Sequence, residues 1–292
     1  MSGPSLSVVV PVYNGGSDLT GCLESLERAC EVAAGVSLDV TISDNHSTDG
    51  TAAVVAAFAE RRGWRVMRPA RHLPRSLHWD YALGHGRGDW LVMLHADDRL
   101  TPDALAAYFG AAATAALEVV LLSGRYRRLS EDGTTESADL PSWLMSSQTI
   151  DGQLLRRRVL SVHNVFLPFT AIRRSCFDAV GGLDTSYELL QDWDLWYRAL
   201  ALGDAVFLPE TVGLWRQHGI SAGYAETFAA EHRRFARRLP ALGGTGPAGV
   251  ALSRAVQLVR ARAITGSRVA TTVLRPALAL TALQLARARR AS

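Results

Sequence analysis

The first 125 residues alternate between short apolar runs and longer stretches of helical composition. The runs are rich in β-branched residues, as buried strands are, and the strands are expected at residues 6–12, 38–43, 64–67, 90–94 and 119–123. Helices are expected at residues 17–31 and 51–62, through 80–84, and after Thr101 as a cap with Pro102 in the first turn. Strands alternating with helices predict an α/β fold, with a mostly parallel, Rossmann-like central sheet flanked by helices.

The second half of the chain is less regular. A turn is expected at the EDGT string near Asp132, and a strand at residues 170–174. Helices are expected at 175–180, stopped by Gly181 and Gly182, and at 191–202. We place the end of the main domain at residue 224, so that residues 1–224 form the α/β unit and 225–292 form a helical C-terminal extension.

Composition excludes several classes of protein. The chain has 292 residues, 48% of them hydrophobic, which is enough for one large core and argues against disorder. Three widely spaced cysteines without a C-x-x-C pair argue against a disulfide framework or a zinc site and fit a reducing compartment. Because the first ten residues show no basic segment before the strand pattern, we expect no signal peptide and a cytoplasmic protein.

The C-terminal extension is strongly basic. From Arg233 onward it holds 12 arginines and no acidic residue, which leaves 19 basic residues against all 28 acidic ones in the remaining chain. Arginines interrupt the apolar stretch 250–286, so an amphipathic interfacial helix or a helix packed on the core is expected there instead of a membrane span. The charge itself has two readings: a solvated helical face, or a surface that docks on the anionic inner face of a membrane. The tail lacks the interleaved aromatic residues on which bases would stack, which argues against nucleic-acid binding.

Polar clusters follow three of the expected strands: Tyr13-Asn14, Asp44-Asn45, and His95 to Asp98. Ligands of parallel α/β sheets bind beyond the carboxyl ends of the strands. The three clusters therefore predict one crevice. Asp97 and Asp98 in it could hold a divalent cation and, through it, a diphosphate; alternatively, one carboxylate caps a turn and the other is solvated.

Asp192 lies near the expected start of a helix, in the string QDWDLW. Asp192 and Asp194 are two residues apart, so they do not share a helix face. Asp192 could accept a proton from a hydroxyl nucleophile. Alternatively, it only stabilises the helix dipole at the N-terminus.

Five strings, in order, resemble the motifs of glycosyltransferase family 2, an inverting family with the GT-A fold. They are VVVPVYN (8–14), ISDNHSTDGT (42–51), WDYALGHGRGDWLVMLHADDRLTPDAL (79–105), GGLDTSYELLQDWDLWYRAL (181–200) and LWRQHGIS (214–221). The resemblance extends over about residues 6–224, most of the chain. Each string is weak alone, but the shared order and spacing make the resemblance specific.

The resemblance implies roles for individual residues. The nucleotide pocket would be lined by Pro11, Val12, Tyr13 and Asn14. Asp44 would bind the base and Asp192 would be the general base. Asp97 would bind the metal, Mn or Mg, and Asp98 would support Asp97 or contact the donor sugar. His218 would add a C-terminal metal or diphosphate contact; a neutral imidazole is a competent ligand.

The chain departs from the family pattern at three points. His95 replaces the first acid of the D-x-D metal motif, so it can bond a ribose hydroxyl but brings no negative charge. Gln191 replaces the frequent glutamate before the base. The polar pattern before the fourth strand is altered, and Arg75 is the candidate cation for the donor phosphates.

The expected function is transfer of a sugar from a nucleotide-diphosphate donor (UDP-, dTDP- or GDP-linked) to a hydroxyl of a glycan, lipid-linked or small-molecule acceptor. A non-catalytic nucleotide-sugar or glycan-binding module remains an alternative because of His95 and Gln191. A nucleotidyltransferase is a second alternative, although PVYNGGSDL lacks the basic residue that its phosphate loop usually carries. No G-x-G-x-x-G follows the first strand, which disfavours a dinucleotide-dependent dehydrogenase.

Overall fold

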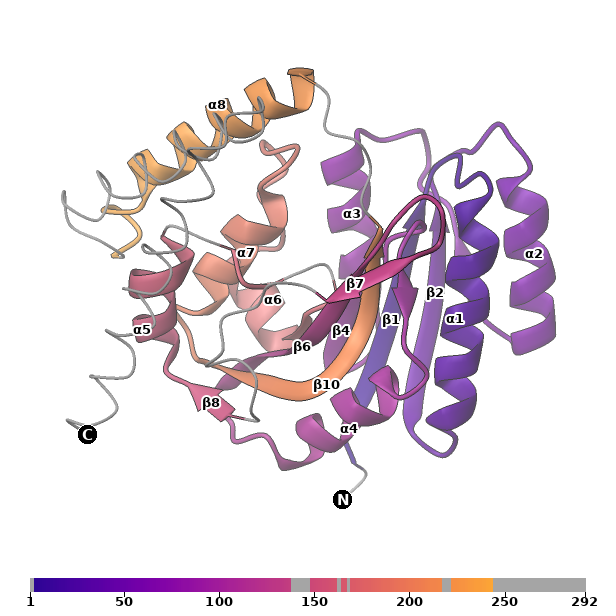
Figure 1. The fold of residues 1–292 in the computed structure, drawn as a ribbon, viewed down its shortest axis with the longest axis horizontal. Helices are drawn as coiled ribbons and strands as arrows, with labels where there is room; N and C mark the ends of the chain where they lie inside the picture. The colour runs from indigo at the N-terminus through magenta and orange to yellow at the C-terminus, as the bar shows by residue number, and fades with distance from the viewer. Residues whose placement is uncertain (1–2, 138–147, 162–163, 167–168, 217–221, 244–292) are drawn as a thin grey trace.

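The computed structural model describes residues 3–137, 148–161, 164–166, 169–216 and 222–243, and its centre is a ten-stranded sheet with helices on both faces (Figure 1). The strands are β1 (Ser5–Val12), β2 (Ser37–Asp44), β3 (Arg65–Met67), β4 (Trp90–Met93), β5 (Arg99–Leu100), β6 (Val119–Leu129), β7 (Thr135–Ser137), β8 (Gln148–Ile150), β9 (Ala171–Arg173) and β10 (Asp204–Arg216). The helices are α1 (Asp18–Val32), α2 (Thr51–Arg62), α3 (Arg75–Gly84), α4 (Ala104–Thr114), α5 (Gly152–Leu155), α6 (Arg174–Val180), α7 (Gln191–Ala199) and α8 (Ala222–Arg238), with a π-helical turn at Arg156–Leu160 after α5.

The sheet is parallel in its first half and mixed in its second. Its order is β3-β2-β1-β4-β9-β6-β10-β5, with β7 on β6 and β8 on β10. The strands from β3 to β4 are all parallel, as the β–α alternation predicts. β9 then runs antiparallel to both β4 and β6, so the carboxyl-end crevice is formed by the parallel half.

Successive residues of β1 pack into two different cores, which explains its unbroken apolar sequence. Leu6, Val8 and Val10 face a core shared with α1, α2 and α4, whereas Val9 faces a core shared with α3, α6 and α7. Figure 1 shows α1 and α2 on one side of the strands and α6 and α7 on the other. Both faces of β1 are therefore buried, and β1 is exposed to solvent only at its ends.

Several local predictions are confirmed, and one is wrong. Gly181 ends α6 with φ +77°, and Gly133, with φ +83°, makes the β6–β7 turn. Thr101 does not cap α4: its hydroxyl donates to the carbonyl of Thr211, and Asp103 takes the N-cap position. The pairing of β5 with β10 takes Thr101 into the sheet edge, and α4 begins three residues later.

The helix α8 packs on the α/β unit. Phe235, Ala236 and Leu239 are fully buried, and Phe235 lies against Trp193 and Tyr197 of α7. Residues 222–243 are the described part around the predicted boundary at 224, which stays a prediction, and the arginine-rich stretch 250–286 lies outside the described residues. Within the described residues, no helix has the length and apolar character needed to cross a membrane.

Candidate active site at the carboxyl ends of the strands

A cavity of about 570 Å³ opens beyond the ends of β1, β2 and β4. It is lined by Pro11, Val12, Tyr13, Asn14, Gly15 and Asp18 after β1, by Asn45 after β2, by His72, Leu73, Arg75, His78 and Trp79 in and before α3, and by His95, Ala96 and Asp97 after β4. The three polar strand ends thus meet in one crevice, as predicted.

The predicted site residues do not all reach the cavity wall. Those that line it are Pro11, Val12, Tyr13, Asn14, Arg75, His95 and Asp97. Asp44 and Asp98 are buried, and each is next in sequence to a residue that lines it. Asp192 lies on α7, and His218 lies outside the described residues.

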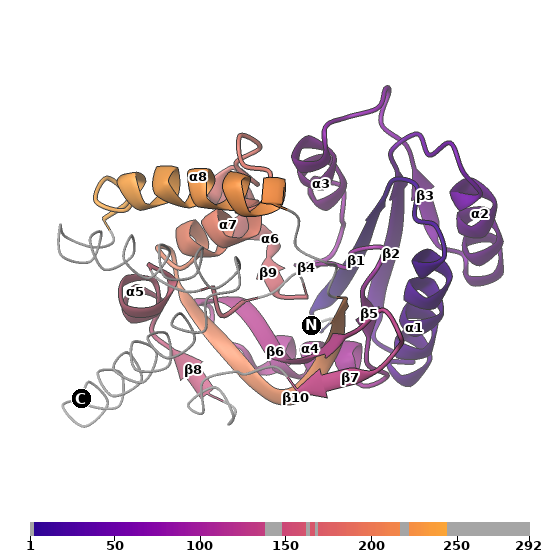
Figure 2. The same ribbon diagram turned by 45° about the horizontal axis from the view of Figure 1, so that its top comes forward.

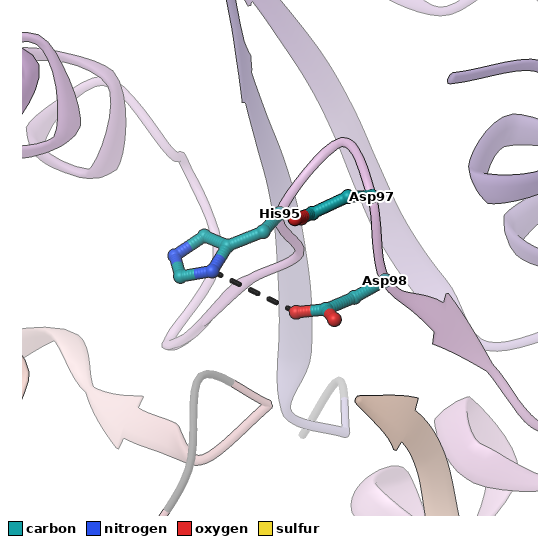
Figure 3. Close-up of side chains that lie close together, drawn as sticks. All are labelled: His95, Asp97 and Asp98. Atoms are coloured by element: carbon teal, nitrogen blue, oxygen red, sulfur yellow. Dashed lines mark ion pairs between the residues drawn. The ribbon is translucent and has the colours of Figure 1, made fainter. Parts of the chain in front are cut away.

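His95, Asp97 and Asp98 form a compact cluster on the loop between β4 and β5 (Figure 3). One potential ligand atom from each lies within 4.8 Å of the others, and His95 Nδ1 is 3.6 Å from Asp98 Oδ2. Asp98 is 1% exposed, and its Oδ1 accepts a hydrogen bond of 2.8 Å from the backbone amide of Arg216. The end of β10 therefore fixes the orientation of the second acid.

The electrostatics of this cluster fit a bound cation. Burial raises the pKa of Asp98 well above its usual value, and the nearby charge of Asp97 raises it further. Burial lowers the pKa of His95 to about 4, so the imidazole is neutral at physiological pH. Among the described residues, Asp98 Oδ2 and His95 Nε2 have no hydrogen-bond partner. Carboxylate oxygens and a neutral imidazole suit a divalent cation, so His95, Asp97 and Asp98 are a chemically competent ligand set.

A stack of side chains forms the wall beside this cluster. The ring of Trp79 stacks on His95 with centroids 4.2 Å apart, and the guanidinium of Arg75 lies 5.4 Å from the Trp79 ring. Arg75 and Trp79 are four residues apart on α3, so they share one helix face. The sequence showed only that the polar pattern before the fourth strand departs from that of the family, so the support of His95 by Trp79 was not predicted.

Asp44 is held behind the crevice wall. Its Oδ1 accepts from the backbone amide of Ser47 at 2.9 Å, and its Oδ2 pairs with the guanidinium of Arg68. Burial raises its pKa, but these hydrogen bonds outweigh burial and keep the pKa below its usual value. Asn45 lines the cavity instead. Its side-chain amide donates a hydrogen bond to the carbonyl of Leu73 and accepts one from the backbone amide of Leu73. The role of Arg68 was not predicted.

Asn14 adopts φ +50°, which is unusual for a residue other than glycine. Its side-chain oxygen accepts a hydrogen bond from the backbone amide of Thr48 at 2.8 Å, and its backbone amide donates one to Ser47 Oγ at 2.9 Å. The loops after β1 and β2 are thereby tied together at the cavity rim. Asn14 therefore joins the two loops and also lines the cavity.

Asp192 is the second residue of α7 and is partly buried. Its Oδ1 accepts from the backbone amide of Trp193 at 2.7 Å and its Oδ2 from the amide of Asn164 at 3.4 Å. Burial outweighs these hydrogen bonds and raises the pKa of Asp192 to about 6. Asp194 points elsewhere and pairs with Arg198 at 2.6 Å, so the two acids have separate surroundings, as their spacing predicts.

The pKa of Tyr224 responds to the charges of both Asp192 and Arg75. Burial raises the pKa of Tyr224, the charge of Asp192 raises it further, and the charge of Arg75 lowers it. Arg75 lines the cavity. The charges of Asp192 and Arg75 thus act on the same phenol, but Asp192 is not among the residues that line the cavity.

Comparison with known proteins gives one family and several related sequences. The profile of the family described as "Glycosyl transferase family 2" matches residues 7–181. The succinoglycan biosynthesis protein ExoO of Rhizobium meliloti is 27% identical over 218 residues, 72% of this chain and 60% of that protein. A PGL/p-HBAD biosynthesis glycosyltransferase of Mycobacterium bovis is 25% identical over 260 residues, 82% of this chain and 86% of that protein. An uncharacterized Mycobacterium tuberculosis protein is 33% identical over 102 residues, and the chain spans only 30% of its length.

Solved structures share the fold at low sequence identity. Staphylococcus aureus TarS (1-349) in complex with UDP-GlcNAc superposes with a TM-score of 0.59 at 18% identity, covering 80% of this chain and 66% of that one. The mannosyltransferase PcManGT of Pyrobaculum calidifontis, in complex with GDP-Man and Mn²⁺, gives 0.58 at 19% identity, covering 96% and 81%. These two structures support the GT-A architecture predicted from the motifs. With the family profile matching more than half of its residues, the chain belongs to glycosyl transferase family 2.

Proposed function

We propose that this chain transfers a glycosyl group from a nucleotide-diphosphate sugar to an acceptor hydroxyl, with inversion at the anomeric carbon. The observation that supports this most directly is the meeting of three polar strand ends in one cavity, with His95 and Asp97 of the His95–Asp97–Asp98 cluster on its wall. The family and the glycosyltransferase among its relatives agree with this reaction class.

The donor binds in the crevice, with its nucleotide against residues 11–14 and its diphosphate near Asp97. His95, Asp97 and Asp98 hold a divalent cation, Mn or Mg, which supplies positive charge next to the diphosphate when bound. Arg75 brings a second positive charge to the cavity wall. The related structures contain UDP-GlcNAc in one case and GDP-Man in the other, so the nucleotide of this chain stays open between UDP, dTDP and GDP.

Asp192 acts as the general base. It accepts the proton of the acceptor hydroxyl while the oxygen forms a bond to the anomeric carbon and the bond to the diphosphate oxygen breaks. A carboxyl with a pKa of about 6 is ionised at neutral pH yet basic enough to take a proton in the transition state. The amides of Asn164 and Trp193 hold the carboxylate in one orientation.

The acceptor is a glycan, a lipid-linked glycan or a small hydroxyl compound. The relatives named for succinoglycan and PGL/p-HBAD biosynthesis favour a cell-envelope or extracellular glycan product. The basic extension would bring the enzyme to an anionic membrane surface, where a lipid-linked acceptor lies. Co-sedimentation with anionic vesicles tests this last point: no pelleting at moderate salt would remove the membrane from the proposal.

The decisive experiment screens UDP-, dTDP- and GDP-sugars with Mn²⁺ or Mg²⁺ and measures nucleotide diphosphate release and product formation. We expect turnover with one donor class, and its loss in both Asp97→Ala and Asp192→Asn. Binding of nucleotide sugars without turnover in the wild type, across glycan and lipid-linked acceptors, would favour the non-catalytic alternative. Full transfer by Asp192→Asn would overturn the base assignment.

A further inference from the structure

One carboxylate on α8 binds three consecutive backbone amides ahead of α7. Glu231 Oε1 accepts from the amide of Glu188 at 2.6 Å, and its Oε2 accepts from those of Leu189 at 2.9 Å and Leu190 at 3.1 Å. Glu231 is only 9% exposed, so these hydrogen bonds are shielded from water. The interaction joins parts of the chain that are more than 40 residues apart.

The bound segment leads directly into the helix that carries Asp192. Leu190 is the N-cap residue of α7 and, being apolar, provides no side-chain cap. Glu231 places negative charge and two acceptor oxygens at this end of the helix from outside, where the helix dipole favours an anion. Because Asp192 is the second residue of α7, a shift of this segment would move its carboxylate.

The helix α3 also holds this segment, through the carbonyls of the segment. The guanidinium of Arg75 donates to the carbonyl of Glu188, and the hydroxyl of Ser76 donates to that of Tyr187. Arg75 also lines the donor crevice. The segment before Asp192 is therefore fixed by two helices. Glu231 of α8 accepts hydrogen bonds from its backbone amides, and α3, which forms part of the donor site, donates hydrogen bonds to its carbonyls. In Figure 2, α8 lies along α7 with its first turn towards α3.

Further contacts of α8 keep Glu231 in place. Arg238, two turns away on the same helix, pairs with Asp184 at 2.6 Å and approaches Asp194 at 3.6 Å. Arg234 donates to the carbonyl of Ser186 at 2.8 Å. The helix thus contacts the segment before α7 at several points, and among these contacts those of Glu231 lie nearest to Asp192 in sequence.

We propose that Glu231 is a positioning residue for glycosyl transfer, which sets the place of Asp192 relative to the donor crevice by holding the amides of residues 188–190. The proposal rests on the proposed function, in which Asp192 is the general base. It assigns a role in the reaction to a helix that the sequence places outside the α/β unit.

The test is Glu231→Gln, measured with the full-length chain and the donor found by the screen. Glutamine keeps the side-chain length, but it offers one acceptor oxygen and turns an NH₂ group towards the backbone amides. We expect kcat to fall about 10- to 100-fold because the base is displaced by a fraction of an ångström or more. The donor KM and the affinity for the nucleoside diphosphate are expected to stay within about twofold, since the crevice is intact.

Two matched controls separate positioning from loss of stability. Glu226→Gln changes the same residue type at an exposed site of the same helix and is expected to behave as wild type. Phe235→Leu lowers stability from within the core of α8 without touching the three amides. All variants are compared at a temperature where each is fully folded by circular dichroism.

The proposal is supported if kcat falls much further in Glu231→Gln than in Phe235→Leu while the donor KM of Glu231→Gln is unchanged. It is overturned if Glu231→Gln turns over as fast as wild type, or no more slowly than Phe235→Leu. Asp192→Asn in the same assay separates the two levels of inference. An active Asp192→Asn would reject the base itself, whereas an inactive Asp192→Asn with a fully active Glu231→Gln would reject only the role of Glu231.

Discussion

The backbone amide of Arg216 donates a hydrogen bond of 2.8 Å to the buried carboxylate of Asp98. The guanidinium of the same residue reaches Asp18 Oδ1 at 2.8 Å and the carbonyl of Asp97 at 3.4 Å. Arg216 is the last residue of β10, whereas Asp97 and Asp98 follow β4. One arginine thus connects the final strand of the sheet to the acidic cluster and to the start of α1.

Replacing Arg216 by methionine tests how much this connection stabilises the fold. The substitution keeps the backbone amide and much of the apolar stem, but it removes the contacts to Asp18 and to the Asp97 carbonyl. We expect the free energy of unfolding to fall by roughly 1–2 kcal/mol, since Asp18 is partly solvated and its pairing is screened. Urea unfolding measures the loss. The exposed Arg237→Met is the control, and an equally small effect of both substitutions would contradict the expectation.

Asp97 is expected to be essential for turnover. Asp97→Ala removes a carboxylate from the only His/Cys/Asp/Glu cluster of metal-site type found among the described residues. We expect at least a ~100-fold loss of kcat, because a cation at a developing phosphate charge is worth several kcal/mol. Chelation by EDTA should produce a comparable loss in the wild type, reversed by Mn²⁺. Asp103→Ala, an exposed acid at the start of α4, serves as the control; full activity in EDTA would count against a metal role for the cluster.

The activity of the enzyme should rise as pH increases through about 6. Burial raises the pKa of Asp192 to about 6, and only the ionised form can accept a proton. The acid limb of kcat/KM should therefore have its midpoint near that pH. A midpoint near pH 4 would mean that a different group controls the limb.

The same pKa makes a prediction about stability. The folded protein holds the Asp192 proton more tightly than the unfolded chain does, so ionisation between about pH 4 and 6 disfavours the folded state. This contribution is present below the unfolded pKa and is lost as pH rises through the folded pKa. Asp192→Asn should therefore unfold at an equal or higher temperature than wild type at pH 7 while losing activity. A lower melting temperature for this variant at pH 7 would disagree with the raised pKa.

Trp79 should affect donor binding through His95. Trp79→Ala removes the ring that stacks on the imidazole at 4.2 Å and opens the cavity wall. Aromatic pairs contribute about 0.5–1.5 kcal/mol, so we expect the donor KM to rise roughly 2- to 10-fold. Trp79→Phe keeps a stacking ring and should retain most of the affinity. Equal donor KM values for Trp79→Ala and wild type would show that the stack does not shape the site.

Phe235→Ala tests whether α8 belongs to the folding unit of the α/β core. The side chain is fully buried and contacts the rings of Trp193 and Tyr197. Removing a buried phenylalanine typically costs 3–5 kcal/mol, so the main unfolding transition should shift by about that amount. A separate, minor transition for α8 with an unchanged main transition would favour a domain boundary near residue 224.

The regular first half was predictable because strand and helix periods alternate there without interruption. The strand at residues 6–12 and the helix at 51–62 were predicted correctly, because a parallel sheet with its covering helices buries the apolar residues of both. The same logic located the crevice, because the carboxyl ends of parallel strands coincide. The motif order then assigned the family, which the profile over residues 7–181 confirms.

The antiparallel half and the supporting residues were not predictable in this way. The position of β9 between β4 and β6 depends on long-range pairing, which leaves no periodic signal in its three residues. Arg68, Trp79, Glu231 and Arg216 act through partners about 16 to 200 residues away. Glu231 in particular reads as an ordinary charge on an amphipathic helix, because nothing nearby in the sequence points to the amides that it binds.

The pairing of Arg216 with Asp98 also bears on the order in which the protein folds. The two residues are separated by 118 positions, and loop closure over such a distance is entropically unfavourable until other contacts have formed. During synthesis, β1, β2 and β4 can assemble well before β10 leaves the ribosome. The acidic cluster would then lack the backbone amide of Arg216 as its partner. The ability to bind a cation should therefore be acquired late, after the core around β1, β2 and β4 has formed.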